Sequence, residues 1–556
     1  MAGLKMNLAF APVGKDLTEA WQEGCDIAAF VRGIVRDPGY AFTPRAWAHA
    51  KYTPVCGHDG LADVLGGLKD QTVYLCLSAE RGVFALASDT AVWAGTMQDA
   101  GLSSDDLSGL GIVCEDPVEV RAVFSSTAGV PDFDSVLYLT AELNGKPQSL
   151  DDLEIKYFGG AVPEQPADDS TDKWIQYAAD RCTMLRKVYA CVKARVDALP
   201  DADRERLLRC YSMRKDTQEA FAQMRRHGLH VDVPMAKAML ASRKNGLAMQ
   251  YGADVPQKER VRTTNLQKLI AAADDHGDVR ALYSLYGTAT GRISCSKPNL
   301  QGIDGHFKKL VQARLGRKLV VADYARAEFR IAAILAEDEA LAAFFADGAD
   351  IHDRTSQEIA GSDAGGKAAD RRLGKTVNFG FLYGQGARGL QHSLNEKYGI
   401  VLSIEQCRAL QARFRKSYPI LDAWGSSVRD AANTVDMQCT AFPRTGVHTA
   451  TGRWVPIIPF GRSGYTCPVN YTVQGTGADI MLLVLGKLPK LLDGLDAVIV
   501  NCVHDEVLVE ASEADAEKAA TALAAAMTEA FTAVFPTADV RNLVDVHIAD
   551  NWAEAK

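Results

Sequence analysis

Cysteines are few and scattered in this sequence. The 12 cysteines among 556 residues include no CxxC pair, and none lies near a histidine at a zinc-finger interval. Long apolar runs are also missing, since stretches such as Met481–Leu485 are far shorter than the ~20 residues of a membrane span. The opening residues do not predict a signal peptide. We therefore expect no membrane segment, reduced thiols and a cytoplasmic location.

Neither sign of charge dominates, because 61 basic residues face 70 acidic ones and the net charge is −9. This balance gives no sign of a nucleic-acid partner and does not exclude one, since binding depends on where the positive charge lies. The 47% apolar and 24% charged residues are typical of a folded globular chain and exclude a mainly disordered one. At ~150 residues per domain, the length allows three or four domains.

Hydrophobic patterns divide the chain near residue 200. Val73–Leu77 and Val83–Leu86 alternate like strands, residues 163–172 are typical of a loop, and residues 173–198 have helical spacing. This predicts an α/β unit over about 1–200. Basic residues then gather over 204–226, where they form either a solvated helix face or a grip on a phosphate backbone.

Two aspartates stand at the ends of apolar strands, 182 positions apart. Asp323 ends the predicted strand Leu319–Asp323, and Asp505 lies beside His504 at the predicted turn of a hairpin over 497–511. Each has a simpler interpretation, as a helix N-cap or as a turn residue. If the two converge at one sheet edge, however, divalent cations would offset their repulsion.

A row of four side chains follows at intervals of four residues, over a predicted helix at 370–383. Four-residue steps drift only ~40° around a helix, so one face presents Arg371, Lys375, Phe379 and Tyr383. An amphipathic core helix would explain the two rings but not two cations in line with them. A nucleotide along the helix explains all four, with cations on the phosphates and rings on the sugar and base.

These segments resemble a known family. The stretches DYARAEFR (323–330), RRLGKTVNFGFLYG (371–384) and VHDEV (503–507) resemble motifs A, B and C of the family A DNA polymerases, the DNA polymerase I group, in order and spacing. Three more segments support this: TATGRISCSKPNLQGI (288–303), DIHDRT (350–355) and NYTVQGTGADI (470–480). The resemblance covers roughly residues 200–556.

The resemblance implies two-metal-ion nucleotidyl transfer from dNTPs to a primer 3′-hydroxyl. It makes Asp323 and Asp505 the metal-binding and catalytic carboxylates, with the Tyr324 carbonyl as a further ligand. Two Mg²⁺ ions are implied, with Mn²⁺ as a substitute. Lys375 would contact the α-phosphate and act as general acid to pyrophosphate.

Further roles follow from the same resemblance. Arg371 and His352 would contact the triphosphate, Phe379 the sugar, and Tyr383 the templating base, while Glu328 would be the steric gate against a ribose 2′-hydroxyl. Contacts to the DNA minor groove and primer terminus are implied for a separate set, with one supporting carboxylate: Arg292, Asn470, Gln474 and His504, and then Glu506.

The chain departs from the family pattern in three places. Ala327 replaces a large aliphatic residue, and Thr466 stands where some relatives carry arginine. The span 228–288 is shorter than the usual thumb, which predicts a weaker grip on DNA.

The first 200 residues resemble a 3′–5′ exonuclease domain that has lost its metal ligands. The segments 133–159 and 176–185 carry this resemblance. Arg181 stands in place of a metal-binding aspartate, Ser78 and Glu80 mark a damaged first motif, and the middle aspartate aligns with Val120. Because arginine cannot bind Mg²⁺, we expect a fold without nuclease activity. An unrelated α/β domain is the alternative.

The resulting hypothesis is a multidomain α/β and α+β protein with a right-hand polymerase fold and an RNase H-like N-terminal domain. It predicts an exonuclease-like domain at 1–200, a short thumb at 201–280, palm at 281–345 and 436–556, and fingers at 346–435. The compact size suggests a phage-like replication or repair enzyme without proofreading, acting in the host cytoplasm. Its expected partners are primer-template DNA, dNTPs and replication accessory proteins, with no membrane.

Two other functions compete with this hypothesis. A single-subunit RNA polymerase shares the aspartates and the helix, although the bulky Glu328 argues against it. A non-catalytic DNA-binding or processivity subunit would not need both Asp323 and Asp505 together with Lys375.

Overall fold

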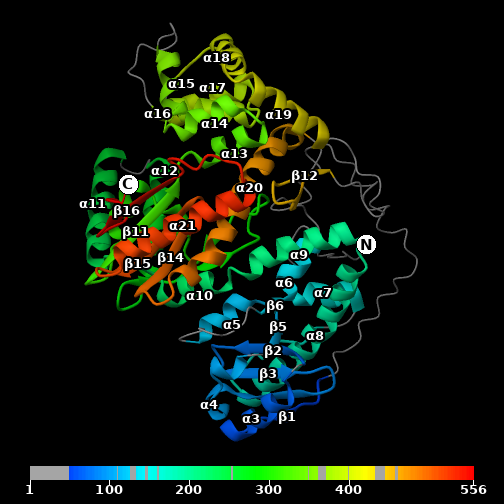
Figure 1. Ribbon diagram of the computed structural model, residues 1–556. Helices are drawn as coiled ribbons and strands as arrows, with labels where there is room; N and C mark the ends of the chain where they lie inside the picture. The colour runs from blue at the N-terminus through cyan, green and yellow to red at the C-terminus, as the bar shows by residue number, and fades with distance from the viewer. Residues whose placement is uncertain are drawn as a thin grey trace, which may run out of the picture.

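The structure is a computed structural model that describes residues 49–69, 71–108, 110–124, 133–144, 148–158, 162–251, 255–348, 350–360, 371–398, 400–432, 445–457 and 461–555. In Figure 1 a sheet domain lies at the bottom, a second sheet with its helices lies in the middle, and a layer of helices lies at the top. Among the described residues, no helix combines the length and the apolar character needed to cross a membrane.

The bottom domain is built around a mixed six-stranded sheet, called here the N-terminal sheet. Its strand order is β1-β4-β3-β2-β5-β6; β2, β3 and β4 pair antiparallel, and β2, β5 and β6 pair parallel. The strands are β1 Thr53–Pro54, β2 Thr72–Ser78, β3 Val83–Ala87, β4 Val92–Thr96, β5 Gly111–Cys114 and β6 Asp134–Ser135. The helices are α3 Gly57–Gly67, α4 Met97–Ala100, α5 Pro117–Val123, α6 Val136–Asn144, α7 Leu150–Phe158 and α8 Thr171–Asp197.

The α/β unit predicted before residue 200 is therefore present. Apolar residues on both faces of β3 are buried, because α8 covers one face of the sheet and a separate apolar cluster fills the other. Residues 163–170 of the loop predicted at 163–172 contain no helix or strand, and α8 begins at Thr171, inside that span.

Two helices, α9 Asp201–Lys215 and α10 Gln218–His227, lead into the larger part of the molecule. Most cations of this basic stretch form intramolecular ion pairs: Arg204 with Asp201, Arg206 with Asp203, Arg214 with Glu142, Lys215 with Asp134 and Arg226 with Glu219. The structure thus favours internal charge balance over the phosphate-gripping interpretation.

The middle part is built on a four-stranded antiparallel sheet, called here the C-terminal sheet. Its strand order is β14-β15-β11-β16, with β11 Arg317–Tyr324, β14 Ala497–Val503, β15 Glu506–Ser512 and β16 Val544–Ala549. The long helix α21 Ala516–Val534 packs on this sheet, and the longer helix α20 Gly461–Leu491 packs against α21. The elements before it are β7 Leu229–His230, α11 Val233–Tyr251, α12 Gln257–Ala272, β8 Asp278–Val279, β9 Leu282–Ser284 and β10 Ser294–Ser296.

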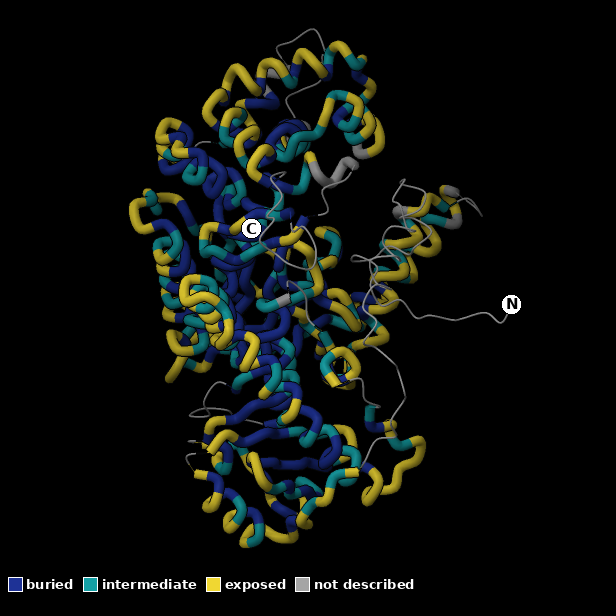
Figure 2. Tube along the Cα trace, turned by 90° about the vertical axis from the view of Figure 1, so that its right-hand side faces the viewer, coloured by how far each residue is buried: buried dark blue, intermediate teal, exposed yellow. Residues whose placement is uncertain are grey.

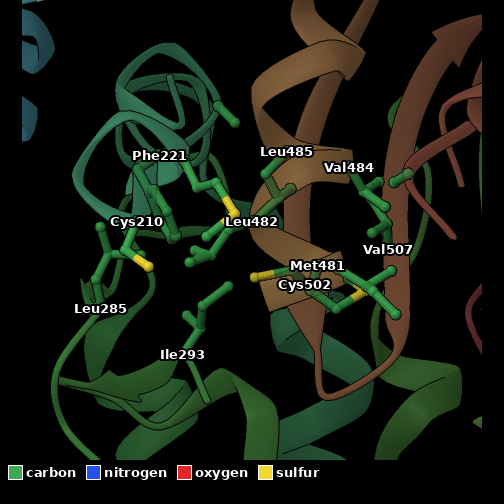
Figure 3. Packing of buried hydrophobic residues seen from close by; sticks show 14 of the residues in the cluster. Cys210, Phe221, Leu285, Ile293, Met481, Leu482, Val484, Leu485, Cys502 and Val507 are labelled. Atoms are coloured by element: carbon green, nitrogen blue, oxygen red, sulfur yellow. The ribbon is translucent and has the colours of Figure 1, made fainter. Parts of the chain in front are cut away.

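The core of this part joins segments that are distant in sequence. Figure 3 shows Met481 and Leu482 of α20 lying between Phe221 of α10 and Cys502 and Val507 of the β14–β15 hairpin. The burial colours of Figure 2 show both sheets as largely buried. Helix α20 packs against the hairpin on one side and against α10 on the other. This packing fixes the position of the hairpin turn.

The top layer consists of helices with one short hairpin below it. Helix α13 Ala327–Leu335 leaves the C-terminal sheet, and the layer follows: α14 Glu339–Ala346, α15 Ile351–Ala360, α16 Arg371–Leu382, α17 Ala387–Tyr398, α18 Ile404–Ser417 and α19 Pro419–Ala432. The hairpin strands are β12 Gly446–His448 and β13 Trp454–Pro456. The helix predicted at 370–383 corresponds to α16, and Asp370 lies outside the described residues.

Candidate active site

Asp323 and Asp505 meet at one edge of the C-terminal sheet. In the antiparallel register Asp323 faces Glu506, the residue after Asp505, and the Tyr324 amide donates to the Asp505 carbonyl at 3.3 Å. The predicted hairpin turn is confirmed, since His504 and Asp505 separate β14 from β15. His504 adopts a φ of 57°, a left-handed conformation in which histidine is enriched among non-glycine residues.

Asp323 is not a helix N-cap. The chain continues past it for three residues, and α13 begins only at Ala327 after Arg326 takes a left-handed φ of 57°. From the sequence, a helix is expected from about Ala325; it begins two residues later, because propensity alone does not reveal a left-handed residue. The loop between strand and helix leaves the Asp323 carboxylate at the sheet edge.

The two aspartates repel each other electrostatically. Desolvation, followed by the negative charge of Asp323, raises the pKa of Asp505 to about 6. A carboxyl group in this position gains from a nearby cation, and paired carboxylates with a main-chain carbonyl are the oxygen donors that Mg²⁺ prefers. The donor set therefore fits divalent metal ions. Tyr324 turns its phenol away into the core, where it donates to the Met527 carbonyl at 2.6 Å.

The neighbouring carboxylate, Glu506, is held by fixed partners instead. Its side chain is 7% exposed, accepts a hydrogen bond from the Trp552 indole at 2.8 Å, and pairs with Lys308 at 3.2 Å. The Lys308 ammonium also lies 3.8 Å from the centre of the Trp552 ring. Sequence reasoning missed both partners because nothing local points to them, and the supporting role of Glu506 stays a prediction.

The helical row predicted along α16 is continuous for the residues that can be described. The Lys375 ammonium lies 5.7 Å from the centre of the Phe379 ring, and the Phe379 and Tyr383 rings stack at 6.1 Å with an angle of 27°. Lys375 is exposed, and Tyr383 follows directly after the last helical residue. The side chain of Arg371 lies outside the described part of the structure.

Glu328 connects this row to the rest of the site. Its carboxylate accepts a hydrogen bond from the Tyr383 hydroxyl and forms an ion pair with Arg292. Burial, and then the charge of Glu328, raise the pKa of Tyr383 well above its ordinary value, so the phenol stays protonated and donates. Three predicted residues from segments far apart in sequence therefore form one network.

Several of the predicted site residues line one pocket. Its wall includes six of them: Arg292, Tyr324, Glu328, Gln474, His504 and Asp505. Asn470 lies one turn before Gln474 on α20. Desolvation and the nearby cations of Arg292 and Lys375 lower the pKa of His504. Of the helical row, it is therefore Lys375 whose charge reaches the hairpin turn.

Among the predicted site residues whose side chains the structure describes, His352 is the most buried. It is 3% exposed, packs against the rings of Phe329 and Phe379 at 5.5 Å each, and shares a 3.2 Å hydrogen bond with Asn378. In this conformation its imidazole supports the helical row from behind. Its contact with a triphosphate stays a prediction.

A buried ion pair that sequence reasoning missed anchors the backbone just before Arg292. Arg453 contacts Asp479 at 2.6 Å and donates to the Thr290 and Gly475 carbonyls at 2.8 and 3.1 Å. Its guanidinium rests against Gly291, where a Cβ would come within 2.7 Å of it. The sequence feature that could have revealed this ion pair is Asp479, an aspartate inside the segment NYTVQGTGADI to which no role was assigned.

Near the N-terminal sheet, an ion-pair network surrounds Arg181, the residue that aligns with a metal-binding aspartate in the resemblance. Arg181 on α8 pairs with Glu115 at 2.5 Å and with Asp151. Burial alone would lower the pKa of Arg181, but the two carboxylates raise it above its ordinary value. Ser78 ends β2, Glu80 is exposed in the turn that follows, and Val120 is buried on α5. Glu115 and Asp151 were not singled out from the sequence.

Comparison with known proteins agrees with this geometry. Residues 240–554, more than half of the chain, match the family model described as DNA polymerase family A. The chain belongs to this family. The matched span also lies within the part of the sequence, about 200–556, that carried the resemblance.

Individual relatives match over part of their length. DNA polymerase I of Aquifex aeolicus is 30% identical over 282 residues, which are 50% of this chain and 47% of the relative. The thermostable DNA polymerase I of Thermus aquaticus is 33% identical over 294 residues, 50% of this chain and 33% of the relative. This chain thus aligns with less than half the length of either curated relative.

A solved structure matches over most of the chain. The POL domain of Pol1 from M. smegmatis, in complex with DNA primer-template and dNTP, gives a TM-score of 0.73 at 17% identity. The match covers 90% of this chain and 99% of that one. At this identity the likeness concerns the fold, and it confirms the polymerase-domain fold expected from the sequence.

Proposed function

We propose that this protein is a DNA-templated DNA polymerase that extends a primer 3′-hydroxyl with dNTPs. The observation that carries the proposal is the meeting of Asp323 and Asp505 at one sheet edge, beside the row formed by Lys375, Phe379 and Tyr383. Family membership supports it. We propose the cytoplasm as its location, primer-template DNA and dNTPs as its ligands, and replication accessory proteins as further partners.

Asp323 and Asp505, with the Tyr324 carbonyl, would hold two Mg²⁺ ions. When bound, these ions supply Lewis-acid stabilisation of the charge that develops on the attacking and leaving oxygens. The carboxylates of this chain provide the negative field that concentrates cations at the sheet edge. That field is already expressed in the raised pKa of Asp505.

The other residues bind and orient the nucleotide. The exposed Lys375 ammonium would contact the α-phosphate and donate a proton to the leaving pyrophosphate, with Arg371 and His352 toward the triphosphate. Phe379 would pack on the sugar and Tyr383 beside the templating base. Arg292, Asn470, Gln474 and His504 would contact the minor groove and primer terminus, where correct base pairs present shared acceptors.

Glu328 is proposed as the sugar gate. Held by Arg292 and Tyr383, its carboxylate cannot easily turn away from a ribose 2′-hydroxyl. Glu328→Ala should therefore raise ribonucleotide incorporation by about tenfold or more, since it removes both bulk and an unfavourable contact. Single-nucleotide insertion with dNTPs and rNTPs measures this, and unchanged sugar selectivity would remove Glu328 from the role.

The domain division follows the sequence expectation. We assign the palm to 281–345 and 436–556, the fingers to 346–435, the short thumb to 201–280, and a degenerate exonuclease-like domain to 1–200. The mixed order of the N-terminal sheet and the Arg181 network support a nuclease-type fold without proofreading activity. A phage-like replication or repair role is part of the same proposal.

Primer extension tests the central claim. The parent protein, a defined template, dNTPs and Mg²⁺ should give full extension, whereas Asp505→Ala should give almost none. Extension by Asp505→Ala at the parent rate would overturn the metal assignment and favour a non-catalytic DNA-binding subunit. Efficient extension of the same primer with rNTPs would favour an RNA polymerase.

The absence of proofreading has its own test. A labelled, mismatched primer incubated with Mg²⁺ and no dNTPs should keep its length. Shortening of that primer by the parent protein would contradict the role given to Arg181.

A further inference from the structure

An exposed aromatic ring stands beside the end of α16. Tyr465, in the first turns of α20, is 51% exposed, although large aromatic side chains usually bury most of their surface. The ring lies against the backbone of Gly384: a Cβ at that glycine would come within 3.1 Å of the ring carbon Cε1. The ring is therefore packed on one side and open on another.

A buried arginine fixes the orientation of this ring. Arg429 on α19 is 8% exposed, and the carbon of its guanidinium lies 4.9 Å from the ring centre. Its Nε also donates to the Tyr465 carbonyl at 3.3 Å. The same guanidinium would be 2.9 Å from a Cβ at Gly384, whose φ of 79° already favours glycine. A cation–π contact from a desolvated guanidinium holds the ring in place and leaves its other face free.

The place of the ring suggests what it binds. Gly384 directly follows Tyr383, the residue assigned to the templating base, and the Tyr383 hydroxyl is tied to Glu328. Tyr465 thus lies beside the residue that directly follows the proposed templating contact along the chain. Unpaired bases are bound without sequence preference by stacking on exposed aromatic rings, because every base has a π-face.

We propose that Tyr465 is a stacking platform for the unpaired template nucleotide next to the templating base, with Arg429 as its positioning residue. The inference rests on the proposed polymerase function and adds a template-strand contact to it. The Arg429 guanidinium occupies one face of the ring, so a base would stack on the other face. The platform should act on any template sequence.

Two templates that share one primer test this proposal. One template ends at the templating nucleotide, and the other continues for several unpaired nucleotides. Tyr465→Leu should weaken binding of the longer template about fivefold more than binding of the shorter one, as expected for the loss of one base–aromatic stack. Ile420→Ala, which alters an exposed apolar side chain on the neighbouring helix α19, is the matched control and should weaken both equally little.

A fluorescent base reports stacking independently of activity. With 2-aminopurine at the first unpaired template position, the parent and Tyr465→Phe should quench its emission, and Tyr465→Leu should restore it. Equal weakening of both templates by Tyr465→Leu, or quenching that this variant leaves intact, would overturn the proposal. Failure of the parent protein to extend the primer on either template would instead overturn the polymerase function.

Discussion

The two sheets of this protein carry acidic side chains at their edges and balance that charge in opposite ways. At the N-terminal sheet, Glu115 and Asp151 are neutralised by Arg181, a cation built into the chain. At the C-terminal sheet, Asp505 lies beside Asp323, and desolvation and that second charge raise its pKa. An edge that supplies its own cation has no need of metal ions, whereas one that gathers like charges favours them.

Arg181 makes the N-terminal edge a closed ion-pair network in which the cation is part of the chain. The charge of its two acidic partners is therefore balanced without a metal ion. The comparison predicts that charge changes at the two edges will have opposite consequences.

The largest effect is expected at the C-terminal edge. Asp323→Asn keeps the shape of the side chain and removes its charge, so extension should fall about a thousandfold or more, as a loss of several kcal/mol of transition-state stabilisation implies. Single-turnover primer extension measures the rate. Asp493→Asn, an exposed aspartate before β14, should extend at the parent rate. A tenfold loss or less for Asp323→Asn would remove it from the metal site.

Arg181→Asp should break the balance at the N-terminal edge. Three carboxylates would then meet without a cation, and the local opening free energy should fall by about 2 kcal/mol, since one partner of a half-buried ion pair is lost. Amide hydrogen exchange along α8 in the full chain measures this. Adding Mg²⁺ should restore part of the protection in this variant and none in the parent. Equal responses of the two proteins would contradict the comparison.

Removing the charge of Asp505 should stabilise the metal-free fold. Because the folded-state pKa of about 6 lies above the ordinary 3.8, ionisation of Asp505 costs stability as the pH rises through this window, and the cost is complete above it. In EDTA at pH 8, Asp505→Asn should gain about 1 kcal/mol over the parent. The gain should vanish below pH 4. Hydrogen exchange of the β14–β15 amides measures it, and a constant gain at both pH values would contradict this cause.

The smallest effect is expected from Glu506→Gln. The amide can still accept from Trp552, while the charge interaction with Lys308 is lost. Extension should fall no more than about fivefold, because the hydrogen bond that positions the side chain is kept and the loss of one hydrogen bond costs about 1 kcal/mol. A loss as large as that of Asp323→Asn would make Glu506 a third member of the metal site.

Local sequence patterns were enough to predict the parts of the site that depend on neighbours along the chain. The four-residue spacing from Lys375 to Tyr383 specifies one helix face, and the apolar halves around His504 and Asp505 specify a hairpin turn. The predicted start of the helix after Asp323 was less accurate, because the left-handed residue Arg326 delays α13. Backbone exceptions of this kind are stabilised by surroundings that a local pattern does not contain.

What the sequence by itself determined is therefore which chemical groups exist and on which elements they lie. Only the tertiary structure decided their partners: Arg181 reaches Glu115 across 66 positions, Trp552 reaches Glu506 across 46, and Arg429 reaches Tyr465 across 36. Helix and strand periodicities act over a few residues, whereas an ion pair or a ring contact forms wherever packing brings two groups within a few ångströms. For that reason the sequence showed which carboxylates are present. It did not show which groups balance their charge at each sheet edge.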